Sequence, residues 1–202
     1  MILESKSLET KRLFIRHGKK EDYVKVYEYD YRKLKEVNGA FKLVKLDPKI
    51  GESFAPNSKY INDMYDWIIY LKDNNIPIGN ILADRIKKTN DITSIEIAYN
   101  LHPLYWGNEY IKESVIEVMN YLYSQGFDII IIGYEKGNKK SKRVIEKLGF
   151  KNYKIIPSQT ENQIDTYEYY LTKEEFETKY KHKTLWLKNK KHNLFLCFFI
   201  II

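Results

Sequence analysis

The stretch best suited to binding an anion is residues 100–110, Asn-Leu-His-Pro-Leu-Tyr-Trp-Gly-Asn-Glu-Tyr. Residues 95–101 alternate between apolar and polar types, which favours a strand, and apolar residues recur at helical spacing from Ile111 onward. Pro103 and Gly107 mark the turn between these two elements. Backbone N–H groups at a helix start lack intrahelical partners and lie at the positive end of the dipole, so this turn could hold a phosphate. A turn that merely connects a strand to a helix has the same pattern.

A second candidate for chemistry is residues 137–150, Gly-Asn-Lys-Lys-Ser-Lys-Arg-Val-Ile-Glu-Lys-Leu-Gly-Phe. Asn138 precedes an amphipathic helix and Gly149 follows it, which predicts a capped helix with a defined stop. Ser141 lies in its first turn, where a hydroxyl can bond to the helix backbone. Taken alone, the segment favours an ordinary capped helix with a solvated lysine face.

The elements that must position these residues form one mixed α/β domain. Spacing and turn signals predict a strand at 13–15, a helix from 21, a long loop at 38–62, an antiparallel meander at 65–71, 78–86 and 94–101, a helix from about 108 to 126, a buried strand at 128–134, a helix at 138–149, and strands at 150–156 and 164–171. Four consecutive isoleucines in 128–134 favour a central strand that is covered on both faces. The order predicts a mixed sheet flanked by helices.

Charge and length limit the possible partners. The chain has 202 residues and a net charge of +7, but residues 136–151 and 179–192 each carry a local charge of +6. Lysine makes up 29 of the 34 basic residues, and lysine lacks the planar fork that reads bases, so no specific nucleic-acid partner is expected. Non-specific nucleic-acid binding through the lysines of 179–191 stays an alternative.

The cysteine and histidine content indicates whether a disulfide or a metal site is expected, and the two ends of the chain indicate which cell compartment is expected. Cys197 is the sole cysteine and the four histidines lack ligand spacing, so neither a disulfide nor a metal is expected. The charged N-terminal residues contain no apolar signal region, which favours a cytoplasmic protein. Residues 194–202 are nine apolar residues, fewer than the roughly 20 that span a bilayer, so no stable membrane insertion is expected.

Several dispersed motifs occur in one order along the chain. They are Thr10-Lys-Arg-Leu-Phe-Ile-Arg16 with Glu21-Asp22, Pro77-Ile-Gly-Asn80, Glu96-Ile-Ala-Tyr99, Tyr105-Trp-Gly-Asn108, Glu113, and Asn138 to Phe150. Over about residues 8–175, this order resembles the GNAT N-acetyltransferase superfamily, in the branch related to ribosomal-protein N-terminal acetyltransferases. The resemblance implies a GNAT-like acyl-CoA N-acyltransferase fold over residues 1–178, with a mixed, mostly antiparallel sheet, and leaves 179–202 as a basic and then apolar tail of unassigned role.

The activity that the resemblance implies is acetyl transfer from acetyl-CoA, as co-substrate, to a primary amine of a small molecule or peptide. The amine attacks the thioester directly in a ternary complex, and no metal takes part. A homodimer is compatible with this family. In the family, the fourth strand splays from the fifth, here residues 94–101 and 128–134, and the pantetheine lies between them like an added strand.

The resemblance also implies which residues bind the cofactor. The expected contacts are Asn100, Leu101, Trp106, Gly107, Asn108, Glu109, Tyr110, Ile111, Asn138, Ser141 and Lys142. Relatives usually have Arg or Gln where this chain has Leu104, a second Gly or Ala where it has Glu109, and many have a Tyr acid where it has Ile145. These departures support an alternative, a catalytically weak or inactive GNAT-fold protein that binds CoA or a partner.

Two residues are the candidates for catalysis. Glu96 lies on the strand face opposite Ile95 and Ile97, where it could act as the base, and an ion pair with Arg85 is an equal interpretation. Ser141 is the candidate for protonating the departing thiolate, and a backbone N–H near Asn100 or Leu101 is the expected oxyanion donor. Acceptor binding is expected at Tyr29, Asp30, Glu36 and Asp165, because acids there could hold a cationic amine.

Overall fold

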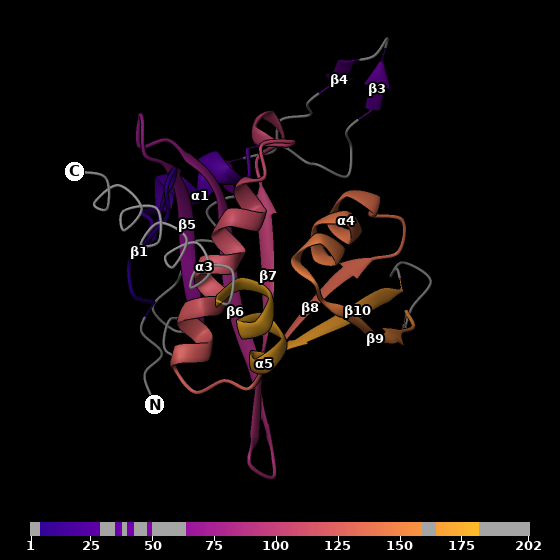
Figure 1. The fold of residues 1–202 in the computed structure, drawn as a ribbon. Helices are drawn as coiled ribbons and strands as arrows, with labels where there is room; N and C mark the ends of the chain where they lie inside the picture. The colour runs from indigo at the N-terminus through magenta and orange to yellow at the C-terminus, as the bar shows by residue number, and fades with distance from the viewer. Residues whose placement is uncertain are drawn as a thin grey trace, which may run out of the picture.

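The computed structural model describes residues 5–28, 35–37, 40–42, 48–49, 64–158 and 165–181. Its main sheet consists of β1 (Leu8–Glu9), β2 (Leu13–Arg16), β5 (Tyr65–Leu71), β6 (Pro77–Thr89), β7 (Ile92–Leu101), β8 (Ile129–Glu135), β9 (Lys151–Ile156) and β10 (Thr166–Thr172). The strand order is β1-β2-β5-β6-β7-β8-β10-β9 (Figure 1). A separate two-stranded ribbon pairs β3 (Lys35–Val37) with β4 (Ala40–Lys42).

The helices are α1 (Lys20–Val26), α3 (Tyr110–Ser124), α4 (Lys139–Leu148) and α5 (Lys173–Phe176), with a 3-10 turn at Pro103–Tyr105 and a π-helical turn at Glu177–Lys181. Every pairing in the main sheet is antiparallel except that of β7 with β8. The parallel pair follows from the crossover through α3, because a strand that returns after a helix runs in the same direction as the first. The expected mixed, mostly antiparallel α/β architecture is therefore confirmed.

Two apolar clusters hold the helices against the two faces of the sheet. On one face, Ile95, Ile97, Ile130 and Ile132 pack with buried residues of α3, α4 and α5 in the main core. On the other face, α1 packs on the sheet through a smaller cluster of Tyr23, Val26, Ile68 and Tyr70. Alternate residues of β7 therefore face the α3 and α4 side or the α1 side.

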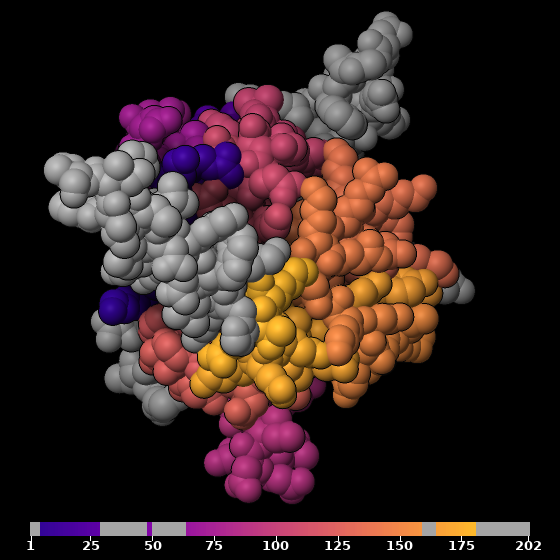
Figure 2. Space-filling model, in the orientation of Figure 1, coloured from indigo at the N-terminus to yellow at the C-terminus, as the bar shows by residue number. Residues whose placement is uncertain are grey.

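The β6–β7 hairpin is longer than its neighbours and projects from the body of the molecule (Figures 1 and 2). Its register shifts between Asp84 and Lys87, and Arg85 at this bulge has a φ of +50°, in the left-handed region. A bulge re-aims a side chain and is common beside functional sites. Here it directs Arg85 toward β7.

The sequence analysis did not predict some elements. The ribbon strand β4 falls inside the expected loop at 38–62, most of which lies outside the described residues. After β10, Tyr180 packs on Phe176 with ring centroids 5.0 Å apart, and its hydroxyl donates to the Leu148 carbonyl at 2.8 Å. The described chain thus contacts the domain up to Tyr180, just past the boundary expected at 178. No helix in the described part of the chain is long and apolar enough to cross a membrane.

Candidate active site

The central feature of the site is a divergence of β7 from β8, which we call the strand split. The two strands are paired only from Ser94 with Ile129 to Ile97 with Ile132. Beyond that point, β7 continues through residues 98–101 and β8 through 133–135, with no pairing between their facing edges in the described structure (Figure 1). An unpaired strand edge offers N–H and C=O groups to an extended chain that carries amides.

The turn before α3 offers a second set of free backbone groups. Within the described residues, the backbone N–H groups of residues 107–112 donate no hydrogen bond. The first hydrogen bond of α3 is made by the Glu113 N–H, which donates to the Glu109 carbonyl at 3.0 Å. Gly107 has a φ of +82°, and a Cβ placed there would meet nothing within 4 Å. Six unpaired N–H groups around an open turn at a helix N-terminus suit an anion such as a pyrophosphate.

Side chains from distant elements hold this turn in place. Arg12 donates from Nη2 to the Asn108 carbonyl at 3.0 Å and from Nε to Glu113 Oε2 at 2.7 Å. Glu113 Oε1 also accepts from the Thr10 hydroxyl at 2.5 Å and from Arg12 N–H at 3.1 Å. Burial opposes ionisation of Glu113, but these hydrogen bonds outweigh it and hold its pKa below the ordinary value. The β1–β2 connection therefore fixes the start of α3.

Asn108 and Trp106 contribute to the turn through their side chains. Asn108 Nδ2 donates to the carbonyls of Tyr105 and Trp106 at 3.1 and 3.2 Å, and the Trp106 indole N–H donates to the Leu101 carbonyl at 2.8 Å. Asn100 Nδ2 donates to the Val26 carbonyl at 3.4 Å, which links β7 to the end of α1. What these residues offer a ligand at this turn is thus chiefly their backbone.

Glu109 is the unusual residue of the turn. It adopts a φ of +61°, a conformation that favours glycine, at the cap of α3. Its carboxylate is held by Lys147 of α4 at 2.6 Å and by Lys112 at 3.4 Å. The hydrogen bond from Lys147, supported by Lys112, holds the pKa of Glu109 below its ordinary value, although solvent screens this exposed site. Two lysines thus compensate the charge that would repel a phosphate.

The structure indicates a lysine that the sequence analysis missed. Lys140 Nζ lies 3.7 Å from the centroid of the Trp106 ring, in a cation–π contact that brings a positive charge to the turn before α3. Lys142, an expected cofactor contact, has its Nζ 3.7 Å from Glu146 Oε1 on its own helix. Spacing along the sequence showed a lysine-rich helix face but not which lysine faces the turn.

The first turn of α4 borders the strand split. Asn138 Oδ1 accepts from Ser141 N–H at 3.1 Å, so Asn138 is the helix cap and its side-chain oxygen is occupied. The Ser141 hydroxyl lies 2.7 Å from the Tyr99 hydroxyl on β7. Ile145, one turn further on, is fully buried in the core. A serine–tyrosine pair therefore connects α4 with β7 across the strand split.

Glu96 lies on the face of β7 opposite this pair, beside the last paired residues. Arg85 Nη1 donates to both Glu96 carboxylate oxygens at 3.0 Å, so the ion pair that the sequence analysis held open is present. This pair and nearby Asp84 raise the pKa of Arg85. A carboxylate has about four lone-pair sites, and one donor nitrogen leaves some of them available to an amine.

Of the four expected acceptor residues, only Asp165 has a side chain that the structure describes. Tyr29 and Asp30 lie outside the described residues, and Glu36 lies on β3, where only the backbone is described. Asp165 accepts from Ser158 N–H at 3.1 Å and from Lys136 at 3.2 Å, and these two bonds lower its pKa. Its carboxylate thus already has protein partners.

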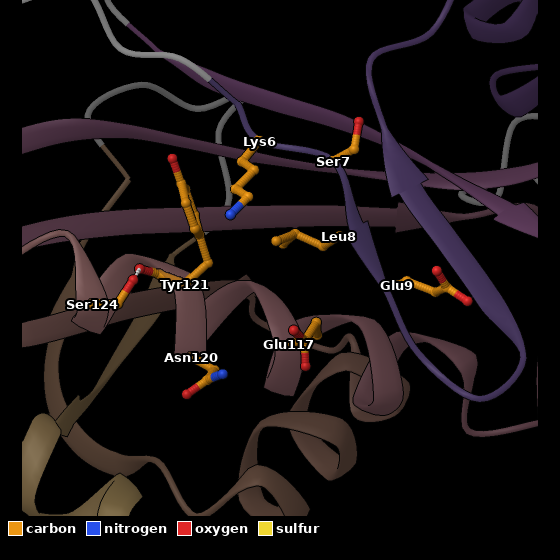
Figure 3. A pocket seen from close by; sticks show the side chains of 8 residues that line it. All are labelled: Lys6, Ser7, Leu8, Glu9, Glu117, Asn120, Tyr121 and Ser124. Atoms are coloured by element: carbon orange, nitrogen blue, oxygen red, sulfur yellow. Dashed lines mark hydrogen bonds between the residues drawn. The ribbon is translucent and has the colours of Figure 1, made fainter.

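A separate groove lies away from these groups. It has a volume of about 320 Å³ and is lined from β1 and its approach by Lys6, Ser7, Leu8 and Glu9 and from α3 by Glu117, Asn120, Tyr121 and Ser124 (Figure 3). It contains none of the expected site residues. Across the described residues, no group of three or more histidine, cysteine, aspartate or glutamate side chains could hold a metal ion.

Comparison with known proteins gives a consistent result. The family model described as an acetyltransferase (GNAT) domain matches residues 12–151, which is more than half of the chain. The search of curated proteins gave no match.

Solved acetyltransferase structures share the fold. A GNAT-family acetyltransferase from Bacillus anthracis is 23% identical, with a TM-score of 0.65, over 84% of this chain and 99% of that one. The ribosomal-protein-S5-alanine acetyltransferase from Vibrio fischeri is 16% identical, with a TM-score of 0.63, over 85% and 99%. A ribosomal-protein alpha-N-acetyltransferase in complex with coenzyme A is 13% identical, with a TM-score of 0.64, over 83% and 98%.

Proposed function

The chain belongs to the acetyltransferase (GNAT) family, and from that premise we propose that it moves an acetyl group from acetyl-CoA to a primary amine by direct attack in a ternary complex. Membership makes the chain an acyltransferase. The observation that carries the specific proposal is the strand split next to a turn with six unpaired N–H groups. The pantetheine arm of acetyl-CoA is an extended chain that carries amides and ends in a pyrophosphate. The arm suits the strand split, and the pyrophosphate suits the turn.

The residues that would hold acetyl-CoA are those of the strand split, the turn and the start of α4. Backbone groups of residues 98–101 pair with the pantetheine arm, and the N–H groups of 107–112 bind the pyrophosphate. Lys140 adds positive charge beside the turn. The compensation of Glu109 by Lys147 and Lys112 weighs against the alternative of a protein that has lost its phosphate site.

Catalysis needs a neutral amine, a stabilised oxyanion and a proton for the departing sulfur. Acetyl-CoA supplies the activated thioester. Glu96 accepts the proton of the amine through lone pairs that Arg85 leaves available. A backbone N–H near Asn100 or Leu101 donates to the oxyanion, and Ser141 donates to the sulfur.

The acceptor that we place first is the N-terminal amine of a protein or peptide. Two of the structures that share the fold are named as ribosomal-protein acetyltransferases, and this likeness is the reason for ranking a protein N-terminal amine first among the candidate acceptors. Asp84 lies directly opposite Glu96 in the sheet register, so these two carboxylates, with the single positive charge of Arg85, leave a net negative charge that favours a cationic acceptor. A free amino acid, a polyamine and an antibiotic amine are the other arms of the test.

Binding and turnover test the proposal together. Isothermal titration with acetyl-CoA should show binding, and release of free thiol should depend on at least one amine of the panel. Glu96→Gln should lower kcat by about a hundredfold, the lower range for a general base. Glu168→Gln is the matched control, because Glu168 is a carboxylate that is also in an ion pair, with Lys154, and lies on β10, which is separated from β7 by β8.

Absence of acetyl-CoA binding would contradict the whole proposal. Binding without thiol release from any amine would support the inactive CoA-binding alternative. Equal effects of Glu96→Gln and Glu168→Gln would remove Glu96 from the mechanism and leave it an ion-pair partner of Arg85.

A further inference from the structure

The contact between Tyr99 and Ser141 has no role in the function proposed above. Tyr99 lies in the part of β7 that extends beyond its last pair with β8, on the face that carries Ile95 and Ile97. Its hydroxyl reaches Ser141 Oγ at 2.7 Å, and the two residues come from a strand and a helix that are 42 positions apart in the chain. The contact therefore lies at the strand split rather than within one element.

The surroundings favour the Tyr99 hydroxyl as the donor in this contact. Burial raises the pKa of Tyr99 to about 12, so its phenol keeps its proton at neutral pH. The remaining contact of the phenol, to the Ser141 carbonyl at 3.5 Å, is at the limit of a hydrogen bond, which leaves Ser141 Oγ as its acceptor. The Ser141 hydroxyl has no other partner among the described side chains, and its own hydrogen is then available to a ligand.

We propose that Tyr99 is a positioning residue that donates to Ser141 Oγ and so orients the Ser141 hydrogen toward the departing sulfur of CoA. This rests on the function proposed above. The new C–N bond forms as Glu96 takes the proton of the amine, and the C–S bond breaks and leaves its electron pair on sulfur. Ser141 donates a hydrogen bond to this thiolate and keeps its proton; the thiolate then takes a proton from solvent, and Glu96 returns its proton to solvent. Tyr99 keeps its own proton throughout and acts only through Ser141.

A titration of bound CoA tests this geometry without any acceptor. The thiolate absorbs in the ultraviolet, so the pKa of the thiol can be measured in the complex of the full chain with CoA. A hydrogen bond to a charged group stabilises it by more than 1 kcal/mol, which corresponds to a thiol pKa lowered by about one unit. Tyr99→Phe and Ser141→Ala should each raise the thiol pKa by about that much, and Ser141→Thr should preserve it.

The matched control is Tyr123→Phe. Tyr123 is a buried tyrosine of α3 whose hydroxyl donates to the Leu171 carbonyl at 2.8 Å in the core, away from the strand split. Tyr123→Phe removes a buried tyrosine hydroxyl, as Tyr99→Phe does, and it should leave the thiol pKa of bound CoA unchanged. An equal effect of Tyr99→Phe and Tyr123→Phe would overturn the proposal.

Kinetics provide the second readout, with hydroxylamine as the acceptor. Tyr99→Phe should lower kcat by about tenfold with an unchanged KM for acetyl-CoA, because the interaction strengthens only as charge develops on sulfur. The double variant should lose no more than Ser141→Ala alone, since Tyr99 acts through that hydroxyl. Losses that multiply in the double variant would contradict this.

Failure of the proposed function and failure of the positioning role of Tyr99 give different results. Absence of CoA binding by the wild-type chain would contradict the function, whereas binding with equal thiol pKa values in wild type, Tyr99→Phe and Ser141→Ala would contradict only the positioning role. If Tyr99→Phe does not unfold cooperatively, Ser141→Ala and Ser141→Thr carry the test. Equal thiol pKa values in those two variants and wild type would then overturn it.

Discussion

Replacing Asp66 by asparagine should make the folded chain less sensitive to pH. Asp66 lies on β5, is 4% exposed, and accepts a hydrogen bond from Tyr23 of α1. Its Oδ1 is buried and has no hydrogen-bond partner among the residues that the structure describes. Burial raises its pKa to about 7, so the carboxyl is protonated in the folded chain over a range where it is ionised in the unfolded chain.

The sign and size of the effect follow from proton linkage. An unfolded aspartate has a pKa of about 3.9, so between about pH 4 and 7 the folded state retains a proton that the unfolded state has lost. The free energy of unfolding therefore falls as pH rises through this window and levels off above it. About three units at 1.36 kcal/mol each correspond to about 4 kcal/mol.

Urea denaturation across this pH range measures the effect. The difference in unfolding free energy between Asp66→Asn and wild type should shift in favour of the variant by about 4 kcal/mol as pH rises from about 4 to 8. Asp91→Asn, which changes an exposed carboxylate in the β6–β7 turn, is the control for the chemical change alone. A difference between Asp66→Asn and wild type that does not vary with pH would refute the reasoning.

Three further predictions concern the turn before α3 that we propose binds the pyrophosphate. Gly107→Ala should destabilise the fold by about 1 kcal/mol, because alanine is strained at a φ of +82°, and should weaken acetyl-CoA binding in a titration. Glu113→Gln removes a charged acceptor of Thr10 and Arg12, so denaturation should show a loss of about 1–3 kcal/mol together with weaker acetyl-CoA binding. Lys140→Ala should raise the Kd for acetyl-CoA by roughly fivefold, about 1 kcal/mol, and by more than Lys142→Ala; equal effects would contradict the assignment of Lys140.

Local signals in the sequence predict much of the frame of the site. Asn138 caps α4 and Gly149 ends it with a φ of +95°, as their positions beside an apolar helical pattern indicate. The parallel pairing of β7 with β8 follows from the crossover through α3. The Arg85–Glu96 ion pair was one of two interpretations of Glu96, and it forms because the bulge at Arg85 directs that side chain toward β7.

Contacts between distant segments could not be predicted in this way. Arg12 meets Glu113 across 101 positions, and Tyr99 meets Ser141 across 42, so both depend on the packing of whole elements. The choice between Lys140 and Lys142 depends on the rotation of α4 about its axis, which a lysine-rich face does not determine.

The most direct test of the account is amide hydrogen exchange of the full chain with and without acetyl-CoA. The account predicts that the cofactor slows exchange at those N–H groups of residues 98–101 that lie on the edge of β7 facing β8, and at the N–H groups of 107–112. That edge of β7 is unpaired beyond Ile97, although the other edge pairs with β6, and the N–H groups of 107–112 have no protein partner in the described structure. Unchanged exchange in both segments, with protection instead around the groove between β1 and α3, would contradict the proposed acetyl-CoA site.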